Sequence, residues 1–465
     1  MARRIVFACS AMLGGIALAG LLTGCSLFDG KSGTKLGTAG RNPSAVRVGV
    51  VDGDLRTRVR GAVVHIRHFK VRTNRKGWAR IPLQHRGKAL VTVTKPGYDP
   101  LSTRLQLSNR PRVGVEIYQG KLQWRIYGAT PSRTQSHPAI HLRPPFRVVW
   151  AKPIGGLIEF PAVVDHGVAY IGNQQGAVKA FSMRDGKLLW RRRTKHTELA
   201  ASPAVYGRFL VVHGMDGYVY LRNRVNGRLL WRFSAGSAIE SSPVVRNGID
   251  YFGTWSGNVY ALDLRRHKVR WVFRSGYKIT SSASFGGGTL FIGDYGGRLL
   301  ALYPRTGRLR WSSSVNGRIY GTPAFAHGRV FVPSSDGRSM TAFSSRGRKL
   351  WSIGTGAYVY SSPAVWGGRV FFGSYNGVLY SVSARNGAVL WRFGTGGAIS
   401  GAVIIVDGVV YAGNFSHRIY GVSARTGRQL LAFPHGDYVP VSGNGGRLLF
   451  HGFSRLFAVQ PRHRR

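Results

Sequence analysis

WSIGTGAYVYSSPAVWGGRVFFGSYNGVLYSVSARNGAVLW (residues 351–391) contains a Ser-Pro pair, a Gly-Gly turn, an alternating apolar run, a second glycine-bounded turn, another apolar run and an Asn-Gly turn, and it both begins and ends on a tryptophan. Apolar residues that alternate with polar ones are typical of half-buried β-strands. Gly, Asn and Pro between such runs are typical of tight turns. The stretch therefore predicts short antiparallel strands joined by turns.

The tryptophan that opens this stretch recurs every 40 or 41 residues, and a leucine takes the eighth position. These positions are Trp150, Trp190, Trp231, Trp271, Trp311, Trp351, Trp391 and Leu431. A period near 40 with four short strands per unit is typical of a β-propeller, because one four-stranded sheet cannot bury both faces without neighbours. An aromatic residue at one place in every unit indicates packing between neighbouring sheets. We therefore predict an all-β fold whose repeats close into a ring.

The number of sheets follows from the two ends of the repeat region. Three inner strands recur eight times, and each copy but the last is followed by an outer strand around its tryptophan. Residues 146–151 form one further outer strand with no inner strands before it. The two ends complement each other, so we predict an eight-bladed propeller over residues 146–460 in which this strand completes the last blade. Seven blades is the alternative, because the last copy is shortened to GFSRLFAV at residues 452–459.

The N-terminus has the features of an export signal. Arg3 and Arg4 precede an apolar run, which ends in Leu22-Thr23-Gly24-Cys25. Basic, apolar and small-residue regions in this order predict a signal peptide at residues 1–24. The last four residues resemble a bacterial lipobox, which implies a lipidated Cys25 at the mature N-terminus. A plain membrane anchor is the alternative, but the run is at the short end for a span and contains glycines.

Composition restricts the class of partner. Cys9 and Cys25 are the only cysteines, so the processed chain has no internal disulfide. Lys and Arg number 67 against 17 Asp and Glu, which gives a net charge of +50. Such a charge is typical of nucleic-acid binding, but export argues against that partner. We expect an anionic lipid surface or an acidic envelope polymer instead; the alternative is that the charge reflects composition alone.

A flexible tether and a small domain are predicted before the ring. Residues 25–44 are rich in Gly, Ser, Thr and Lys and are expected to form the tether. Residues 45–118 carry unrepeated short strands, which predict a small β-sandwich. The turn from Thr73 to Gly77 and the segment Lys95-Pro-Gly-Tyr98 resemble carboxypeptidase-regulatory-like (transthyretin-like) modules. This resemblance implies a spacer or adhesive domain without chemistry of its own.

Residues 119–149 are rich in proline and lack a period, and they predict a lead-in strap laid across the propeller surface. His137 and His141 have the spacing of a ligand pair on a helix, but Pro138 and Pro144 disfavour a helix there. We therefore predict no metal site in the strap. Residues 461–465 form a basic tail.

The repeats resemble a known family. Ala384-Arg-Asn-Gly-Ala-Val-Leu-Trp391 and Ala424-Arg-Thr-Gly-Arg-Gln-Leu-Leu431 are similar to pyrroloquinoline-quinone (PQQ) type propeller repeats, and the resemblance covers residues 124–460. Two functional classes share this repeat. One comprises quinoprotein dehydrogenases, and the other comprises non-catalytic lipoproteins of the BamB type that act in outer-membrane protein assembly.

Acidic residues separate these two classes. The quinoprotein resemblance implies a carboxylate base, a calcium or lanthanide ion held by acidic and amide oxygens, and commonly a vicinal disulfide. Hard cations need several converging anionic oxygens, but the ring has few acids and no cysteine pair. Some of these acids, such as Asp165 and Asp336, adjoin turn glycines, where local hydrogen bonds explain them. We predict no enzyme, no cofactor and no metal, with a PQQ-dependent oxidoreductase as the alternative.

A binding face is predicted where the connections between blades meet the turns after each second strand. Aromatic residues beside a few charges at a channel mouth are typical of peptide or ligand sites. The candidate residues are Glu159, Glu240, Lys278, Arg318, Tyr320, Tyr358, Tyr360, Trp255, Tyr295, Tyr375 and Phe415. The opposite face carries turn arginines such as Arg224, Arg265 and Arg266.

These observations predict a monomeric, non-catalytic scaffold that binds envelope or membrane proteins. It is expected to be lipid-anchored to the cell membrane or outer membrane and to face the periplasm or the cell exterior. Binding of acidic envelope polysaccharide is a second alternative to the scaffold role.

Overall fold

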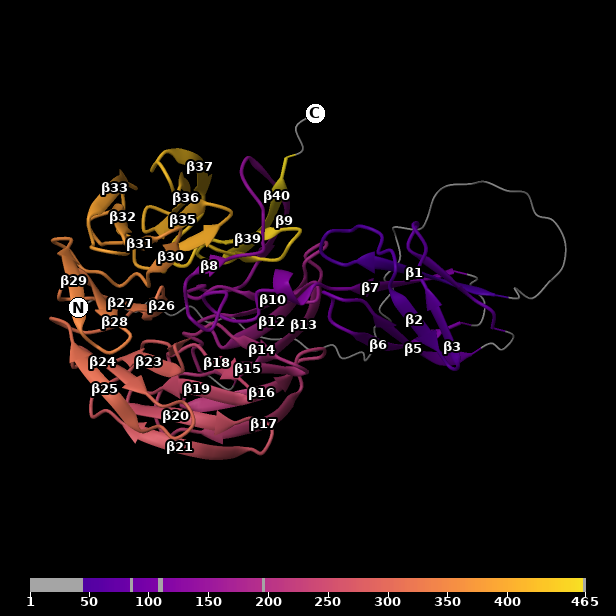
Figure 1. Cartoon of the computed structure of the whole chain (residues 1–465), viewed down its shortest axis with the longest axis horizontal. Coiled ribbons are helices and arrows are strands. Elements are labelled where there is room, and N and C mark those ends of the chain that lie inside the picture. The colour runs from indigo at the N-terminus through magenta and orange to yellow at the C-terminus, as the bar shows by residue number, and fades with distance from the viewer. Residues whose placement is uncertain (1–44, 84–86, 108–111, 195–196, 463–465) are drawn as a thin grey trace, which may run out of the picture. The chain divides into compact units, whose positions relative to one another are not determined.

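The computed structural model describes residues 45–83, 87–107, 112–194 and 197–462. Over these ranges the chain is built from β-strands, with one short 3-10 helix, η1 (Gly120–Leu122) (Figure 1). None of the helical segments in this part of the chain has the length and apolarity to span a bilayer. The predicted signal peptide, Cys25 and the tether lie outside the described residues, as do the last three residues of the predicted tail.

The described residues form two compact units. The first contains residues 45–51, 58–95 and 100–117, and the second contains residues 52–57, 96–99 and 118–462, apart from the gaps given above. The strand pattern of the sequence predicts a domain boundary after residue 118. Contacts add two short loops of the N-terminal region to the second unit, so that unit is not continuous in sequence.

The first unit holds two sheets, ordered β4-β1-β7 and β3-β2-β5-β6, and the second is antiparallel throughout. Their strands are β1 (Val46–Asp52), β2 (Val63–Ile66), β3 (Phe69–Arg72), β4 (Trp78–Ile81), β5 (Lys88–Thr94), β6 (Leu101–Gln106) and β7 (Arg112–Ile117). Alternate side chains are buried, as for Ala89, Val91 and Val93 of β5, because successive residues of a strand point to opposite faces. The Thr73 hydroxyl donates to the Val59 carbonyl and accepts from the Ala62 amide, which ties the turn at that motif to the preceding loop.

The second unit contains eight further sheets, and the first four are formed by consecutive strands. They are β10 (Val163–Asp165), β11 (Val168–Gly172), β12 (Ala177–Ser182) and β13 (Leu188–Arg193); β14 (Ala204–Tyr206), β15 (Phe209–His213), β16 (Tyr218–Asn223) and β17 (Leu229–Ser234); β18 (Val244–Arg246), β19 (Ile249–Gly253), β20 (Asn258–Asp263) and β21 (Lys268–Arg274); and β22 (Ser284–Gly286), β23 (Thr289–Gly293), β24 (Arg298–Leu302) and β25 (Leu309–Ser314).

The remaining four sheets include two strands from the lead-in region. They are β26 (Ala324–Ala326), β27 (Arg329–Ser334), β28 (Ser339–Ser344) and β29 (Lys349–Gly354); β30 (Ala364–Trp366), β31 (Arg369–Gly373), β32 (Val378–Ser383) and β33 (Val389–Gly394); β34 (Ile404–Val406), β35 (Val409–Asn414), β36 (Arg418–Ser423) and β37 (Gln429–Pro434) with β8 (Ser136–His137); and β38 (Val441–Gly443), β39 (Leu448–His451) and β40 (Arg455–Pro461) with β9 (Phe146–Pro153).

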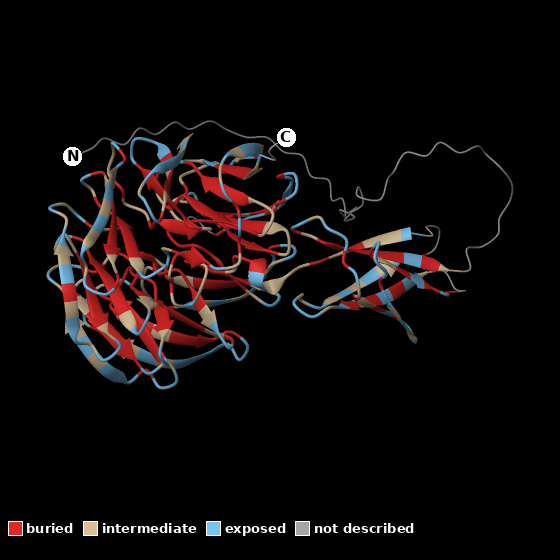
Figure 2. Ribbon diagram, turned by 45° about the horizontal axis from the view of Figure 1, so that its top comes forward, coloured by how far each residue is buried: buried red, intermediate tan, exposed pale blue. Residues whose placement is uncertain are grey.

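This arrangement of four-stranded sheets is of the propeller type that the repeat predicts. The inner three strands of each sheet are largely buried, whereas residues of the outer strands alternate between exposed and intermediate (Figure 2). The last sheet draws its outer strand from before the first repeat, because β9 pairs antiparallel with β40 and places Trp150 opposite Ala458. The sequence predicts this pairing from the complementary ends of the repeat region.

The repeat tryptophans contact the neighbouring sheet. Six of the indoles donate from Nε1 to a backbone carbonyl of the next sheet's last turn, over 2.9 to 3.2 Å. The acceptors are Met183 for Trp150, Arg224 for Trp190, Pro304 for Trp271, Ser345 for Trp311, Ala384 for Trp351 and Ala424 for Trp391. In the remaining repeat, Trp231 stacks on the His267 ring at a centroid distance of 4.5 Å.

A glycine in the same turn makes room for most of these indoles. Gly387 has φ +76°, and a Cβ placed on it would lie 2.8 Å from Cε3 of Trp351. A side chain at this position would therefore clash with the indole and strain the backbone. This contact explains why the tryptophan and the turn glycine recur together in the sequence.

The lead-in strap differs from its prediction over residues 122–137, most of which are buried or half-buried against the innermost strands, whereas Pro138, His141 and Arg143 are exposed. Its carbonyls accept hydrogen bonds from amides of five different inner strands. These bonds join Val205 to Arg125, Phe285 to Pro131, Phe325 to Ser132, Val365 to Thr134 and Ile405 to Gln135. The inner strands have no further strand beyond them, so their free amides attract the strap.

Arg133 lies at the centre of the strap and is 0% exposed. Its Nε donates to the Ala283 carbonyl over 3.0 Å, and its Nη2 donates to the carbonyls of Ser242 and Pro243 over 3.1 and 3.0 Å. Its Nη1 donates to the Tyr127 carbonyl. Burial lowers the pKa of Arg133 to about 10, so the guanidinium still carries its charge at neutral pH. The side chain of Arg133 therefore ties the strap to the two loops that lead into β18 and β22.

His451 joins the last sheet to the first. Its Nε2 accepts from the Ala162 amide over 3.0 Å, and its Nδ1 lies 3.2 Å from the Pro440 carbonyl. These two contacts require a neutral imidazole with its proton on Nδ1. Burial lowers the pKa of this side chain to about 4.

The pKa of His451 predicts an acid-sensitive ring. Between about pH 6.5 and pH 4 the unfolded chain binds a proton at this position that the folded ring does not bind. The free energy of unfolding should therefore fall as the pH is lowered through this window, by on the order of 3 kcal/mol from His451 alone. Urea denaturation above and within the window measures the fall. His451→Gln should remove most of this part of the pH dependence, and an unchanged dependence in that variant would contradict the assignment.

Candidate protein-binding face

The predicted face is organised around Glu240, which is 7% exposed. One of its carboxylate oxygens accepts from the Trp255 indole over 3.0 Å, and the other accepts from the Tyr320 hydroxyl over 2.6 Å. Trp255 belongs to the turn after β19, whereas Tyr320 precedes β26 and is 80 residues away from Glu240 in the chain. The carboxylate thus joins residues from two non-adjacent sheets.

Lys278 lies beside this centre, between two aromatic rings. Its Nζ is 3.3 Å from the centroid of Trp255 and 5.1 Å from that of Tyr295. Burial lowers the pKa of Lys278, and the nearby Glu240 carboxylate opposes that shift. An ammonium over an indole face is a favourable cation–π contact. The face therefore holds a cation among aromatic side chains.

A continuous arc of rings extends from Tyr320. Neighbouring ring centroids along the arc are between 5.0 and 6.0 Å apart, and most pairs are edge-on or tilted. The arc runs through Tyr320, Tyr360, Tyr358, Tyr375, Phe415 and Tyr438. Edge-on and tilted pairs of this kind stabilise one another beyond their burial.

Two further charged groups border the arc. Arg318 forms an ion pair with Asp336, with 3.0 Å between Nε and Oδ2, and its guanidinium lies 5.7 Å from the Tyr295 centroid. Arg338 lies 5.6 Å from the Tyr358 centroid. The Asp336 carboxylate also accepts from the Arg318 amide over 2.6 Å. The expectation of a purely local turn hydrogen bond at Asp336 was therefore wrong, because its partner is 18 residues away.

The carboxylate of Glu159 accepts fewer hydrogen bonds than that of Glu240. Its carboxylate accepts from Gln174 Nε2 over 3.2 Å. Burial raises the pKa of Glu159, and the charges of Glu240 and Glu198 raise it further. Burial, followed by the charges of Glu240 and Glu159, also raises the pKa of Tyr320. Tyr320 therefore remains a neutral hydroxyl that donates to Glu240.

The structure brings all eleven candidate residues onto one group of connections and turns, and several remain open to solvent. Trp255 and Tyr358 are each 40% exposed and Phe415 is 38% exposed. Exposed aromatic side chains in one patch are typical of interaction sites. Tyr438 and Arg338 also belong to this group, although they were not predicted from the sequence. Tyr438 follows Leu431 by the same seven residues that separate Tyr358 from Trp351, so the repeat alignment contained its signal.

The repeat family can be assigned from the whole second unit. The sequence profile described as outer membrane protein assembly factor BamB matches residues 110–273 and 255–462. The chain belongs to the BamB family. BamB of Bordetella pertussis is 33% identical over 97 residues, which is 21% of this chain and 25% of that protein. The chain therefore matches about a quarter of the length of the curated relatives.

Solved structures share the fold at low sequence identity. The crystal structure of BamB from Moraxella catarrhalis has a TM-score of 0.58 and 15% identity, and the match covers 69% of this chain and 99% of that one. The quinohemoprotein alcohol dehydrogenase from Comamonas testosteroni has a TM-score of 0.63 and 12% identity over 74% of this chain and 81% of that enzyme. Identities this low show the fold alone, so the BamB fold is shared with proteins named as enzymes.

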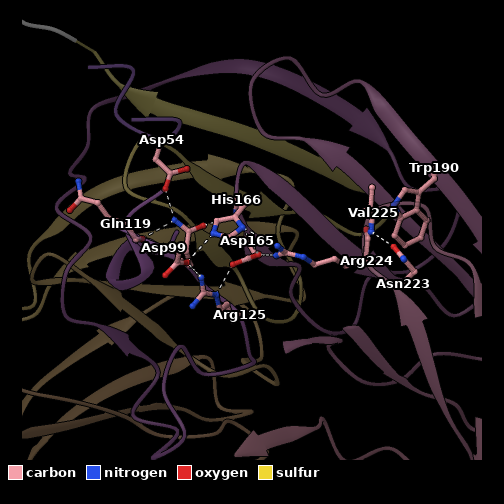
Figure 3. A network of polar contacts seen from close by, with 11 residues as sticks. Asp54, Asp99, Gln119, Arg125, Asp165, His166, Trp190, Asn223, Arg224 and Val225 are labelled. Carbon is pink, nitrogen blue, oxygen red and sulfur yellow. Dashed lines mark hydrogen bonds and ion pairs between the residues drawn. The ribbon is translucent and has the colours of Figure 1, made fainter. Parts of the chain in front are cut away.

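This BamB-family chain has one group of acidic and histidine side chains with the geometry of a metal site among its described residues, formed by Asp99, Asp165 and His166. Figure 3 shows that arginine side chains lie against the carboxylates of this group. Arg125 Nε is 2.5 Å from Asp165 Oδ1, Arg125 also pairs with Asp99, and Arg224 pairs with Asp165. Bound guanidinium groups neutralise both carboxylates, so the group does not fit a hard cation.

The same network corrects two predictions from the sequence. Asp165 is 1% exposed and its partners are distant in sequence, so local turn hydrogen bonds do not explain it. Arg224 is half-buried and paired, and it is not part of the exposed arginine face. Arg266 is exposed, as are most of the other turn arginines. His137 and His141 do not form a ligand pair, because His137 contacts the Gln123 carbonyl and His141 contacts Asp407.

Proposed function

We propose that the chain is a non-catalytic cell-envelope scaffold in which an eight-bladed propeller binds partner proteins. The observation that carries this proposal is the aromatic arc from Tyr320 to Tyr438, together with the Glu240 and Lys278 centre beside it. Aromatic side chains give a large contact area at low entropic cost, and charges at the centre orient the partner. The eight sheets of the second unit support the blade number.

Membership in the BamB family supports the class of partner. Its relatives are named outer membrane protein assembly factors, so we propose that the partners are envelope proteins, including outer-membrane proteins under assembly. Residues 1–24 would direct export, and a lipidated Cys25 would hold the chain at a membrane. The first unit would serve as a spacer module of the carboxypeptidase-regulatory-like type.

The carboxylates that could bind a metal ion support a quinoprotein activity less well than a scaffold role. Calcium requires several oxygen ligands without a competing cation. The described carboxylates that meet the geometry of a metal site are held by Arg125 and Arg224, and Glu240 is held by Trp255 and Tyr320. These residues do not fit a PQQ-calcium pair, so we assign the chain no step of that chemistry.

Affinity capture from native membranes tests the proposed face. The variant carrying both Trp255→Ala and Tyr375→Ala should lose most of its captured partners, because hot-spot aromatic residues each contribute about 2 kcal/mol or more at an interface. Capture with wild type and the double variant, followed by mass spectrometry, measures the loss. Tyr303→Ala is the control, since Tyr303 is 46% exposed and precedes the turn after β24. Identical partners in the double variant and wild type would exclude this face.

A further inference from the structure

Two adjoining hollows lie beside the sheet that contains β34 to β37. The first has a volume of about 470 Å³ and the second about 510 Å³, and Arg143 lines both. The lining of the first includes His141 and Arg143 of the strap together with Trp366, Asp407 and Arg425. The second is lined by Arg143, Pro144, Val409, Ser423, Thr426, Arg428 and Leu430. None of the proposed binding-face residues contributes to either hollow.

Asp407 fixes the basic side chains that come from the strap. Nε of Arg143 lies 3.2 Å from Asp407 Oδ2 and donates to the Asp407 carbonyl over 2.8 Å. Nδ1 of His141 lies 3.3 Å from Asp407 Oδ1. These contacts use one nitrogen of each side chain. The Nη groups of Arg143 remain as donors at the hollows, so Asp407 orients the guanidinium without saturating it.

The turn between β36 and β37 adds two more guanidinium groups. Arg425 lines the first hollow and Arg428 lines the second. Across the described residues, neither arginine forms an ion pair with an acidic side chain. Three arginines thus line the hollows against the single carboxylate of Asp407. This excess of two positive charges favours an anion.

Hydroxyl groups in the same turn complete the set of donors. The Ser423 hydroxyl oxygen accepts from the Thr426 amide over 3.3 Å, and that of Thr426 accepts from the Arg428 amide over 3.4 Å. Each hydroxyl therefore keeps its own hydrogen to donate. Guanidinium groups beside hydroxyl donors match the several acceptor oxygens of a phosphate.

We propose that these hollows form a binding site for a phosphate group. Arg143, Arg425 and Arg428 contact its oxygens, the hydroxyls of Ser423 and Thr426 donate further hydrogen bonds, and Trp366 and Leu430 provide apolar walls for the atoms that carry the phosphate. The ligand is either free inorganic phosphate or the headgroup of a phospholipid. The site does not depend on the protein-binding face.

Calorimetric titration of the purified full chain with inorganic phosphate, and separately with a short-chain phosphatidylglycerol below its micelle concentration, tests the proposal. Both probes should bind saturably. The variant with Arg425→Ala and Arg428→Ala should bind at least roughly tenfold more weakly, because hydrogen bonds from charged donors are the stronger class. Tighter binding of the lipid identifies a headgroup site, and equal or tighter binding of inorganic phosphate identifies a free-phosphate site.

The chain provides a matched control. Residues 305–308 have the same Arg-Thr-Gly-Arg sequence as residues 425–428, and Arg305 and Arg308 are also exposed, but neither of them lines either of the two hollows. Arg305→Ala with Arg308→Ala should leave affinity within about twofold, since it changes only the distant charge. Equal weakening in the two variants, or no saturable binding of either probe, would overturn the proposal.

Discussion

Replacement of Arg133 by methionine is expected to lower the free energy of unfolding of the ring by about 3–5 kcal/mol. The guanidinium is fully buried and donates to carbonyls of Tyr127, Ser242, Pro243 and Ala283. Methionine fills a similar length without donors, so these carbonyls would be buried without that partner. Each unsatisfied buried carbonyl costs about 1–3 kcal/mol, and partial relaxation limits the sum.

Denaturant unfolding of Arg133→Met and wild type measures this loss. Arg266→Met is the matched control, because Arg266 is exposed and its guanidinium has no acidic partner among the described residues. Arg133→Lys should recover only part of the loss, since one ammonium cannot reach acceptors in so many directions. A wild-type midpoint for Arg133→Met would show that the strap is held by its backbone hydrogen bonds alone.

Trp351→Ala is expected to destabilise the ring by about 3–5 kcal/mol, the range for truncating a buried large aromatic residue. The indole is 8% exposed, packs against Gly387 and donates to the Ala384 carbonyl over 3.2 Å. Alanine would leave a cavity between two sheets and remove the donor of that carbonyl. The glycine turn is shaped for the indole, so collapse into the cavity should be incomplete.

Trp255→Ala is the control for that experiment. Trp255 is 40% exposed and belongs to the binding face, so its removal should cost the ring far less than that of Trp351. Thermal or urea unfolding of the two variants gives the comparison. Similar losses for both would mean that Trp255 is part of the core, and the proposed face would then lose its one tryptophan.

The sequence contained most of the information about the sheets. Turn glycines such as Gly387 and the tryptophans of the outer strands lie at constant positions, because each sheet repeats the same contact with the next. The pairing of β9 with β40 also followed from the pattern, since the last copy of the repeat lacks an outer strand and residues 146–151 form an outer strand with no inner strands before it. Repetition makes these features visible in a single sequence.

Features that break the repeat were not predictable in the same way. The sequence around Arg133 has no period, and its acceptors are main-chain carbonyls that any sequence would offer. Among so many arginines, nothing marks this one as buried. Asp165 was misread for a related reason: a turn glycine follows nearby, but its partners Arg125 and Arg224 come from other parts of the chain.

The candidate face falls between these two cases. Alignment of the repeats placed Glu240 and Tyr320 at equivalent positions before the first strand of their sheets, and Tyr375 in the turn after a second strand, which predicted a shared face. It did not predict which of them touch, because the hydrogen bond from Tyr320 to Glu240 crosses between sheets that are not neighbours in sequence. Pairing across the centre depends on side-chain length and direction, which a repeat pattern does not contain.

The pairing of β9 with β40 also has a consequence for biosynthesis. β9 leaves the ribosome before any of the seven sheets that follow it, yet its partner strand is among the last to be made. Until then β9 has an unsatisfied backbone edge, and such edges promote aggregation. A nascent chain in which β40 has not yet been made therefore keeps this open edge and is prone to associate with other chains until translation ends.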